Sequence, residues 1–401
     1  ARDLAARGLG RLITPEIAPV TGAFPSPIGV RLEADVADRA CPLFVGRYIR
    51  GVKNGPSPDW LQDRLRAIGL RPISALVDIT NFFTFDMNRP LHVFDADKVR
   101  GDLRLTRAAG GERLTGLDDK IYVFEPGMTV IADDAGPESI AGVMGGLPTG
   151  CTEETTSVFV EAAYFDPVRT AQTGRGLKIN SDARYRFERG IDPAWTPHGL
   201  EAATRMILDL CGGEPSEVVV AGAIPDHARA YRFDPGRVEK LVGMTIPEEA
   251  QRATLTALGF CLEGEMAHVP PWRPDVTGEA DLVEEVARVA SLTKLEGRPM
   301  RRPRPGVPAP VLTPMQVRES RARRTCAALG LDECVSYSFI DAEAAALFGG
   351  GDAATRLENP ISTEMSHMRP SLLPGLCQAT ARHEARGGPG LLREVRDRGL
   401  G

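Results

Sequence analysis

The sequence predicts an α+β protein built from several domains. Its 401 residues exceed what a single hydrophobic core usually serves. Helical segments and a long run of short strand-like segments follow one another, and proline-rich segments divide them into blocks. A hydrophobic content of 42% and a charged content of 25% are typical of globular proteins.

We divide the chain into four blocks. Residues 1–29 resemble the tail of an earlier helix followed by a linker, because residues 13–29 are rich in Pro, Gly, Ser and Thr. Residues 30–225 form a long module, residues 226–302 a smaller domain, and residues 303–401 a last part that begins in the proline-rich segment 301–310. The chain starts without an initiator methionine or a signal-peptide pattern, so we expect a fragment.

The long module opens with a predicted strand over residues 43–52. A helix should follow, with Ser57 as N-cap, Pro58 in the first turn and Gly69 after its end. Its expected apolar face consists of Trp60, Leu61, Leu65 and Ile68. Short apolar segments separated by Gly and Asp predict a β-rich stretch over residues 103–160. A second helix is predicted over residues 198–211, closed by Gly212.

The smaller domain reads as helix–helix–hairpin–helix. Two amphipathic helices are expected within residues 233–243 and 245–260, then strand-like segments at 261–264 and 267–270, then a helix over 279–292. The last part begins with a basic helix over residues 314–330 and a strand within 334–341.

Bulk properties exclude several classes of protein. No apolar run approaches the roughly 18 residues that a membrane-spanning helix needs, so no membrane partner is expected. The seven cysteines form no CxxC pair and their number is odd, which argues against a disulfide framework or a zinc site and favours a reducing cytoplasm. A net charge of −6 means that any contact with RNA depends on local basic patches.

One group of residues has the composition of a polar pocket with small walls. It consists of Thr80, Asn81, His92, Gly142, Gly145, Glu161, Ser181 and Ala183. Glu161 either faces solvent on an alternating strand or lines a cavity, since a buried carboxylate needs a partner. His92 is either a structural histidine near a proline turn or a functional group. The glycines form tight turns or let the backbone approach a ligand.

A second group is acidic. Asp281, Glu284 and Glu285 share spacings of three and four near the start of a predicted helix, and Asp275 precedes them in a loop. Such oxygen ligands suit Mg²⁺. Acids also favour the first turn of a helix through its dipole, so a solvated acidic face is the alternative.

Four segments carry a resemblance to a known family. VDITNF (77–82), PLHVFDAD (90–97), SDARYRFERGIDP (181–193) and PDVTGEADLVEEVAR (274–288) resemble the bacterial phenylalanyl-tRNA synthetase β subunit, and the resemblance spans nearly the whole chain. It implies the end of B1 in residues 1–29, a B3/B4 editing module in 30–225, a winged-helix-like B5 domain in 226–302 and a truncated class II synthetase-like B6/B7 module in 303–401. Residues 387–401 depart from the family pattern, which has an apolar strand there.

The resemblance also implies an activity. The family forms an α₂β₂ cytoplasmic ligase that joins phenylalanine to tRNA(Phe) with ATP and Mg²⁺, and the ATP chemistry belongs to the α subunit. Its β subunit hydrolyses tyrosine wrongly attached to that tRNA.

Roles for individual residues follow from the same resemblance. Glu161 would hold the tyrosine hydroxyl beside Gly142 and Gly145. Thr80, Asn81 and His92 match positions around the ester and the terminal adenosine. Ser181 stands where the family often has threonine, and Ala183 keeps the wall small. Asp275, Asp281, Glu284 and Glu285 match Mg²⁺ positions at the α-subunit contact.

Three functions remain open on the sequence. The first is ester hydrolysis by a positioned water, with His92 activating water or holding the tRNA end. The second is a non-catalytic scaffold that binds the α subunit and tRNA with an idle pocket. The third is a freestanding hydrolase, against which the acidic helix and the B6-like remnant argue because both make sense as partner-binding parts.

Overall fold

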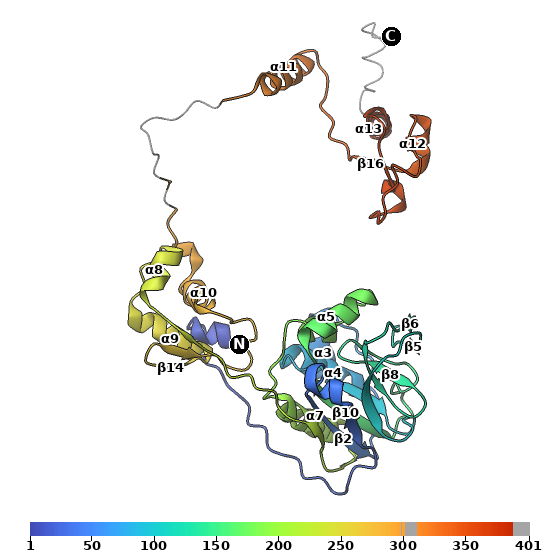
Figure 1. The fold of residues 1–401 in the computed structure, drawn as a ribbon, viewed down its shortest axis with the longest axis vertical. Helices are drawn as coiled ribbons and strands as arrows, with labels where there is room; N and C mark the ends of the chain where they lie inside the picture. Colours follow the sequence, from blue (N-terminus) through green and yellow to red (C-terminus); the bar gives the residue numbers. More distant parts are fainter. Residues whose placement is uncertain (298, 301–310, 388–401) are drawn as a thin grey trace. The chain divides into compact units, whose positions relative to one another are not determined.

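The computed structural model describes residues 1–297, 299–300 and 311–387. The chain divides into two compact units, residues 1–298 and 299–401 (Figure 1). The expectations for the proline-rich segment 301–310 and for the C-terminal residues 388–401 lie outside the described residues. No described helix has both the length and the apolar character to cross a membrane.

The first unit is organised around an antiparallel sheet. Strand β10 (Ser157–Tyr164) lies between β2 (Leu43–Arg50) and β3 (His92–Asp95). Two further strands, β11 (Glu214–Pro215) and β12 (Val219–Gly222), pair with the other edge of β2. The strand predicted over residues 43–52 is confirmed and ends at Arg50.

Three helices cover one face of this sheet: α3 (Asp59–Ala67), α4 (Ala75–Asp86) and α7 (Thr196–Cys211). Gly212 ends α7 with a φ of +70°, as predicted. The predicted start of α3 is wrong by one residue. Pro58 is its N-cap, and the Ser57 hydroxyl instead donates to Asp78 at 2.5 Å. Only two residues of its expected apolar face, Leu61 and Leu65, are buried; Trp60 and Ile68 are exposed.

A second sheet covers the other face. Its strands run in the order β1 (Val30–Leu32), β4 (Leu103–Arg107), β7 (Thr129–Ala132), β8 (Pro137–Ile140) and β9 (Met144–Gly145). A hairpin of β5 (Arg113–Thr115) and β6 (Ile121–Val123) lies beside them, so the predicted β-rich stretch is confirmed. Short helix α2 (Ala34–Arg39) follows β1. The core between the sheets contains Phe44, Phe94, Leu103, Leu105, Ile131 and Phe159.

The predicted linker over residues 13–29 is not free along its whole length. Residues 20–28, which we call the strap, are bound to the first sheet. The Val20 carbonyl accepts from the buried Arg47 guanidinium, and its N–H donates to Glu201, which also pairs with Arg47. Backbone bonds join Ala23 and Phe24 to residues 215 and 217. This part of the predicted linker is therefore held against the sheet by hydrogen-bond partners from distant parts of the chain.

The smaller domain has the predicted order of elements. Strand β13 (Ala230–Arg232) precedes helices α8 (Gly236–Val242) and α9 (Glu248–Leu258). The hairpin of β14 (Cys261–Glu263) and β15 (Met266–His268) and helix α10 (Glu279–Ala290) complete it, with a short 3₁₀ turn, η1 (Leu292–Lys294), after α10. Helix α1 (Arg2–Ala6) packs on α9, and the Arg2 guanidinium lies 3.9 Å from the centre of the Trp272 ring.

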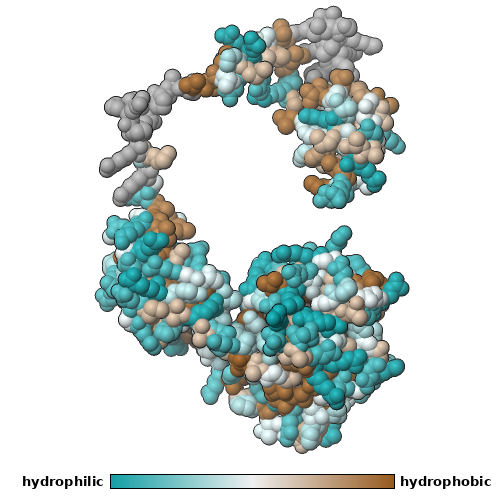
Figure 2. All heavy atoms as spheres, viewed as in Figure 1, coloured by the Kyte–Doolittle hydropathy of each residue, from teal (hydrophilic) through white to brown (hydrophobic). Residues whose placement is uncertain are grey.

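The second unit is less packed. Helix α11 (Pro314–Ala328) is confirmed, and none of its residues is buried. The strand predicted within residues 334–341 is shorter than expected: only β16 (Phe339–Ile340) forms, and it pairs with β17 (His367–Met368). Helices α12 (Ala342–Leu347) and α13 (Leu373–Ala385) flank this pair, with a 3₁₀ turn, η2 (Thr363–Met365), before β17. Figure 2 shows hydrophilic and hydrophobic residues mixed over the visible surface of both units.

Candidate functional site

Glu161 and His92 lie side by side on neighbouring strands. They are cross-strand partners in the pairing of β10 with β3. Residues on one face of a strand alternate, so both side chains share a face with Phe159 and Phe94, which belong to the core between the two sheets. Direct partners in an antiparallel pair have Cβ atoms about 4.5–5.5 Å apart. The fold therefore places a carboxyl group and an imidazole next to each other inside the module.

Burial keeps both groups uncharged near neutral pH. Only 5% of Glu161 is exposed, and burial raises the pKa of its carboxyl group to about 8. Burial lowers the pKa of His92 to about 4. Glu161 Oε2 and His92 Nε2 are both buried without a hydrogen-bond partner in the described part of the chain. The alternative of a solvent-facing Glu161 is therefore wrong, because sheets and helices cover both faces of β10.

The glycine-rich loop, residues 140–146, approaches this pair closely. A Cβ atom on Gly145 would lie 2.1 Å from Cε1 of the His92 ring. Gly142 has a φ of +70°, and a Cβ there would lie 2.9 Å from the Phe165 ring. Both glycines are thus needed for close packing of the loop, and Gly145 holds its backbone directly against the imidazole.

Helix α6 (Asp182–Phe187) forms another wall. Its N-cap is Ser181, whose hydroxyl accepts from Arg184 N at 3.1 Å and donates to the Val143 carbonyl in the glycine-rich loop at 2.5 Å. Ala183 packs against the core between the sheets. Ser181 thus ties the helix to the loop, a capping role that the sequence analysis did not assign to it.

Thr80 and Asn81 are not joined to the buried pair. Both lie on α4, where the Thr80 hydroxyl donates to the Val77 carbonyl at 2.8 Å. Among the described residues, no hydrogen bond or ion pair connects either side chain with His92 or Glu161. Both are half-buried. The structure thus brings Glu161, His92 and Gly145 into direct proximity and ties Ser181 to the glycine-rich loop. Thr80 and Asn81 remain on α4 without a bond to this group among the described residues.

Three residues of the site were missed. Gly46 is the cross-strand partner of Glu161 on β2, and a Cβ there would lie 2.3 Å from the Phe159 ring. Phe159 in turn flanks Glu161 two residues away on the same face. Cys41 is buried in the core between the sheets, and burial, followed by the charge of Glu161, raises the pKa of its thiol. Only the strand register reveals Gly46 and Phe159, so no local signal pointed to them.

The four acidic residues predicted to bind Mg²⁺ do not form a cluster. Arg273 pairs with Asp275 at 2.6 Å and with Glu285 at 2.5 Å, and Arg288 also bonds Glu285. Hydrogen bonds from Arg273 hold the pKa of Asp275 low. Burial alone would raise the pKa of Glu285, but the two arginines outweigh it and lower the pKa.

The other two acids have different surroundings. Asp281 accepts from the N–H groups of Thr277 and Gly278 at 2.7 and 3.0 Å and so caps α10, while Glu284 is exposed. No group of three His, Cys, Asp or Glu residues in the described ranges is arranged to hold a metal ion. Asp275, Asp281 and Glu285 do not fit Mg²⁺ as arranged, because guanidinium groups and backbone N–H groups occupy their oxygens. Mg²⁺ binding stays a prediction.

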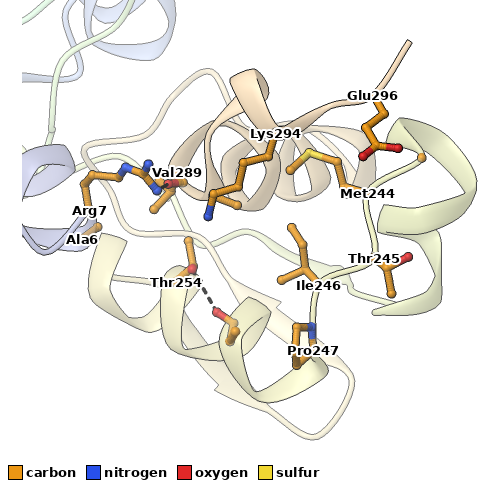
Figure 3. Close-up of a pocket in the computed structure, with 13 residues that line it drawn as sticks. Ala6, Arg7, Met244, Thr245, Ile246, Pro247, Thr254, Val289, Lys294 and Glu296 are labelled. Carbon is orange, nitrogen blue, oxygen red and sulfur yellow. Dashed lines mark hydrogen bonds between the residues drawn. The ribbon is translucent and has the colours of Figure 1, made fainter. Parts of the chain in front are cut away.

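A cavity of about 540 Å³ lies elsewhere, in the smaller domain beside α1. Arg7, Met244, Ile246, Val289, Lys294 and Glu296 are among its lining residues, and Lys294 points into it (Figure 3). It contains neither His92 nor Glu161. The candidate site is therefore defined by its buried polar pair and its glycines.

Comparison with known families divides the chain into three matched segments. Residues 40–212 match the B3/4 domain, and residues 231–291 match the tRNA synthetase B5 domain. Residues 299–392 match the phenylalanyl tRNA synthetase beta chain CLM domain. The buried pair, the glycine-rich loop and α6 all fall in the first segment.

Curated relatives resemble almost the whole chain. A phenylalanine–tRNA ligase beta subunit from Cereibacter sphaeroides is 68% identical over 96% of this chain, and one from Ruegeria pomeroyi is 70% identical over the same share. In each case the match covers 48% of the relative, so the chain spans about half the length of these relatives.

Among solved structures, an N-terminal fragment of the Pyrococcus horikoshii phenylalanyl-tRNA synthetase beta subunit matches with a TM-score of 0.32 and 14% identity. That match covers 68% of this chain and 77% of the other.

Proposed function

Because the chain belongs to the phenylalanine–tRNA ligase β-subunit family, we propose that residues 30–225 hydrolyse tyrosine wrongly attached to tRNA(Phe). The observation that carries this proposal is the buried pair of Glu161 and His92, each with one polar atom that lacks a partner in the described residues. A buried unsatisfied polar group is unfavourable by about 1–3 kcal/mol. A ligand that completes these hydrogen bonds would remove that cost.

Glu161 supplies the specificity. A synthetic pocket shaped for phenylalanine rejects an added hydroxyl only about a hundredfold, whereas a site that hydrogen-bonds that hydroxyl discriminates by roughly ten-thousandfold or more. The Glu161 carboxyl, with its pKa raised to about 8 by burial, is largely protonated at neutral pH and can donate to or accept from a phenol. A phenylalanyl ester would leave it unpaired. The site therefore prefers the tyrosyl ester.

His92 acts by positioning. It lies directly beside Glu161, and a tyrosyl group whose hydroxyl reaches Glu161 carries its ester at the far end of its side chain. The His92 imidazole, which lies beside Glu161, is therefore closer to the tyrosyl hydroxyl than to the ester. A histidine with a pKa of about 4 is also a weak proton acceptor toward water. We therefore assign His92 to orienting the bound group and its water.

The ester end is assigned to polar groups outside the core. Thr80 and Asn81 are half-buried on α4 and would bind the ester and the terminal adenosine. Ser181 and Gly145 set the position of the glycine-rich loop against His92. In this scheme a positioned water attacks the ester carbonyl, and the bond from the carbonyl carbon to the ribose oxygen breaks. One proton of the water restores the ribose hydroxyl of the tRNA, the other passes to solvent, and tyrosine leaves as its carboxylate.

The remaining proposals concern the full ligase, in which this chain would act as a cytoplasmic β subunit. It would assemble with an α subunit as α₂β₂ and bind tRNA(Phe), and the α subunit would supply the ATP chemistry. Residues 226–302 would form a winged-helix-like B5 domain, and residues 303–401 a class II synthetase-like module. Mg²⁺ enters no step of the proposed hydrolysis.

The test is release of tyrosine from Tyr-tRNA(Phe), compared with release of phenylalanine from Phe-tRNA(Phe). Selective release of tyrosine that is lost in Glu161→Ala supports the proposal, and equal rates for both esters in the unmodified chain would refute it.

A scaffold is the second candidate, because α11 has no buried residue in its own unit and so offers its whole surface to a partner. Binding of the α subunit without ester release, with or without that subunit, would favour the scaffold.

A further inference from the structure

The segment that holds α5 (Pro167–Gly176) and α6 carries an excess of basic side chains. Residues 167–190 contain six basic and two acidic side chains, in a chain whose net charge is −6. Arg175 and Lys178 are exposed and have no ion-pair partner among the residues that the structure describes. A local positive surface of this kind attracts phosphates even when the whole chain is acidic.

The same segment carries an exposed aromatic ring. Tyr185 on α6 is 54% exposed, and the Arg189 guanidinium lies 3.6 Å from the centre of its ring. Arg186 lies 4.2 Å from the ring of Phe85 on α4 and 6.0 Å from that of Tyr185. The result is a row of alternating rings and guanidinium groups that joins α4 to α6. Such planar groups form the surfaces on which unpaired bases stack.

The same helix faces the candidate pocket on its other side. Ala183 packs into the core between the sheets, and Ser181 binds the glycine-rich loop. On α4, Phe85 lies four residues after Asn81, so the two share a helix face. The row of rings therefore begins beside a residue assigned to the ester end and leads outward along α6.

We propose that Tyr185 and Arg189 form a stacking platform for the unpaired 3′ end of tRNA, supported from beneath by the largely buried Arg186, with Arg175 and Lys178 contacting the phosphates. This rests on the proposed editing function and adds the surface that delivers the ester. Single-stranded RNA fits because its bases stack on aromatic rings and guanidinium planes, and its backbone matches the unpaired cations.

Local ion pairs do not account for the whole arrangement. Arg186 pairs with Asp182 at 3.1 Å and Arg189 with Glu188 at 2.9 Å, so both side chains are held in place. Those pairs leave Tyr185 more than half exposed and leave Arg175 and Lys178 unpaired. A held guanidinium loses less conformational entropy when a base stacks against it.

The first experiment measures binding of a fluorescent single-stranded RNA that ends in CCA to the 401-residue chain, by anisotropy. Tyr185→Ala should weaken binding about five- to hundredfold, and Tyr185→Phe should keep most of the affinity because the ring remains. The Arg175→Gln, Lys178→Gln double variant should make the salt dependence shallower by about 1.4 in log–log slope. Trp60→Ala is the matched control, since Trp60 is also exposed and lies 5.5 Å from an arginine, Arg64. It should bind normally.

A second experiment separates the platform from the chemistry. On Tyr-tRNA(Phe), Tyr185→Ala should raise KM with little change in kcat. Hydrolysis of tyrosine methyl ester, which has no RNA, should be unchanged. Unaltered RNA binding in a folded Tyr185→Ala variant would overturn the platform whether or not the chain hydrolyses esters, as would loss of α-subunit binding with RNA affinity intact. RNA binding that depends on Tyr185, in a chain that releases no tyrosine, would support the platform and refute editing.

Discussion

Replacing Glu161 with glutamine should make the protein progressively more stable, relative to the unmodified chain, as the pH rises. The folded state holds the Glu161 carboxyl at a pKa of about 8, against a usual value of 4.5. A raised folded pKa means that stability is fully present below 4.5 and is lost as pH rises through 8. Glutamine cannot ionise, so Glu161→Gln removes this loss.

The magnitude follows from the shift. One pKa unit corresponds to about 1.4 kcal/mol, so the relative gain is near zero at pH 4.5, about 3 kcal/mol at pH 7 and about 5 kcal/mol above pH 8. The glutamine amide also needs a partner in a site where Glu161 Oε2 has none among the described residues. That penalty is independent of pH, so the slope of about 1.4 kcal/mol per pH unit is the quantity to test.

Urea unfolding between pH 5 and 8, followed by tryptophan fluorescence, measures this slope. Two of the three tryptophans, Trp60 and Trp195, lie in the same module as Glu161. Glu153→Gln is the control, because Glu153 is exposed shortly before β10 and its replacement should show no such trend. A difference between Glu161→Gln and the unmodified chain that stays constant over this range would refute the burial argument.

Three further outcomes are expected. Gly145→Ala should destabilise by about 1–3 kcal/mol through its clash with the His92 ring; addition of His92→Ala should restore most of this in a double-mutant cycle, and additive effects would contradict the contact. Arg47→Met should destabilise by about 3–5 kcal/mol, because Glu201 loses its partner, and should expose the strap to limited proteolysis; an equally resistant strap would exclude this role. Asp281→Ala should lower stability by about 1 kcal/mol equally with and without Mg²⁺, as loss of a helix cap does; a Mg²⁺-dependent loss in thermal unfolding would indicate a metal ligand.

Much of the architecture could be predicted because it is encoded in short stretches. Helix α7 is marked by its apolar spacing and by Gly212, which alone tolerates the φ that ends it. The alternation of strands and turns over residues 103–160 is also encoded by residues close together in the sequence. The same holds for the helix–helix–hairpin–helix order of the smaller domain. The prediction of a helix start was wrong where a distant side chain bound the expected capping group. Ser57 was predicted as an N-cap, but its hydroxyl donates to Asp78.

The sequence by itself determined which residues were candidates, including Glu161, His92 and Gly145. Only the tertiary structure decided what surrounds them. The pairing of β10 with β3 makes Glu161 and His92 neighbours, and coverage of both faces of the sheet buries them. The tertiary structure also decided that Glu285 pairs with two arginines. The physical reason is that the periodicity of apolar residues in the sequence indicates only which side chains share a face of a helix or strand. Burial, strand register and the partner of each charge depend on residues far apart in the chain.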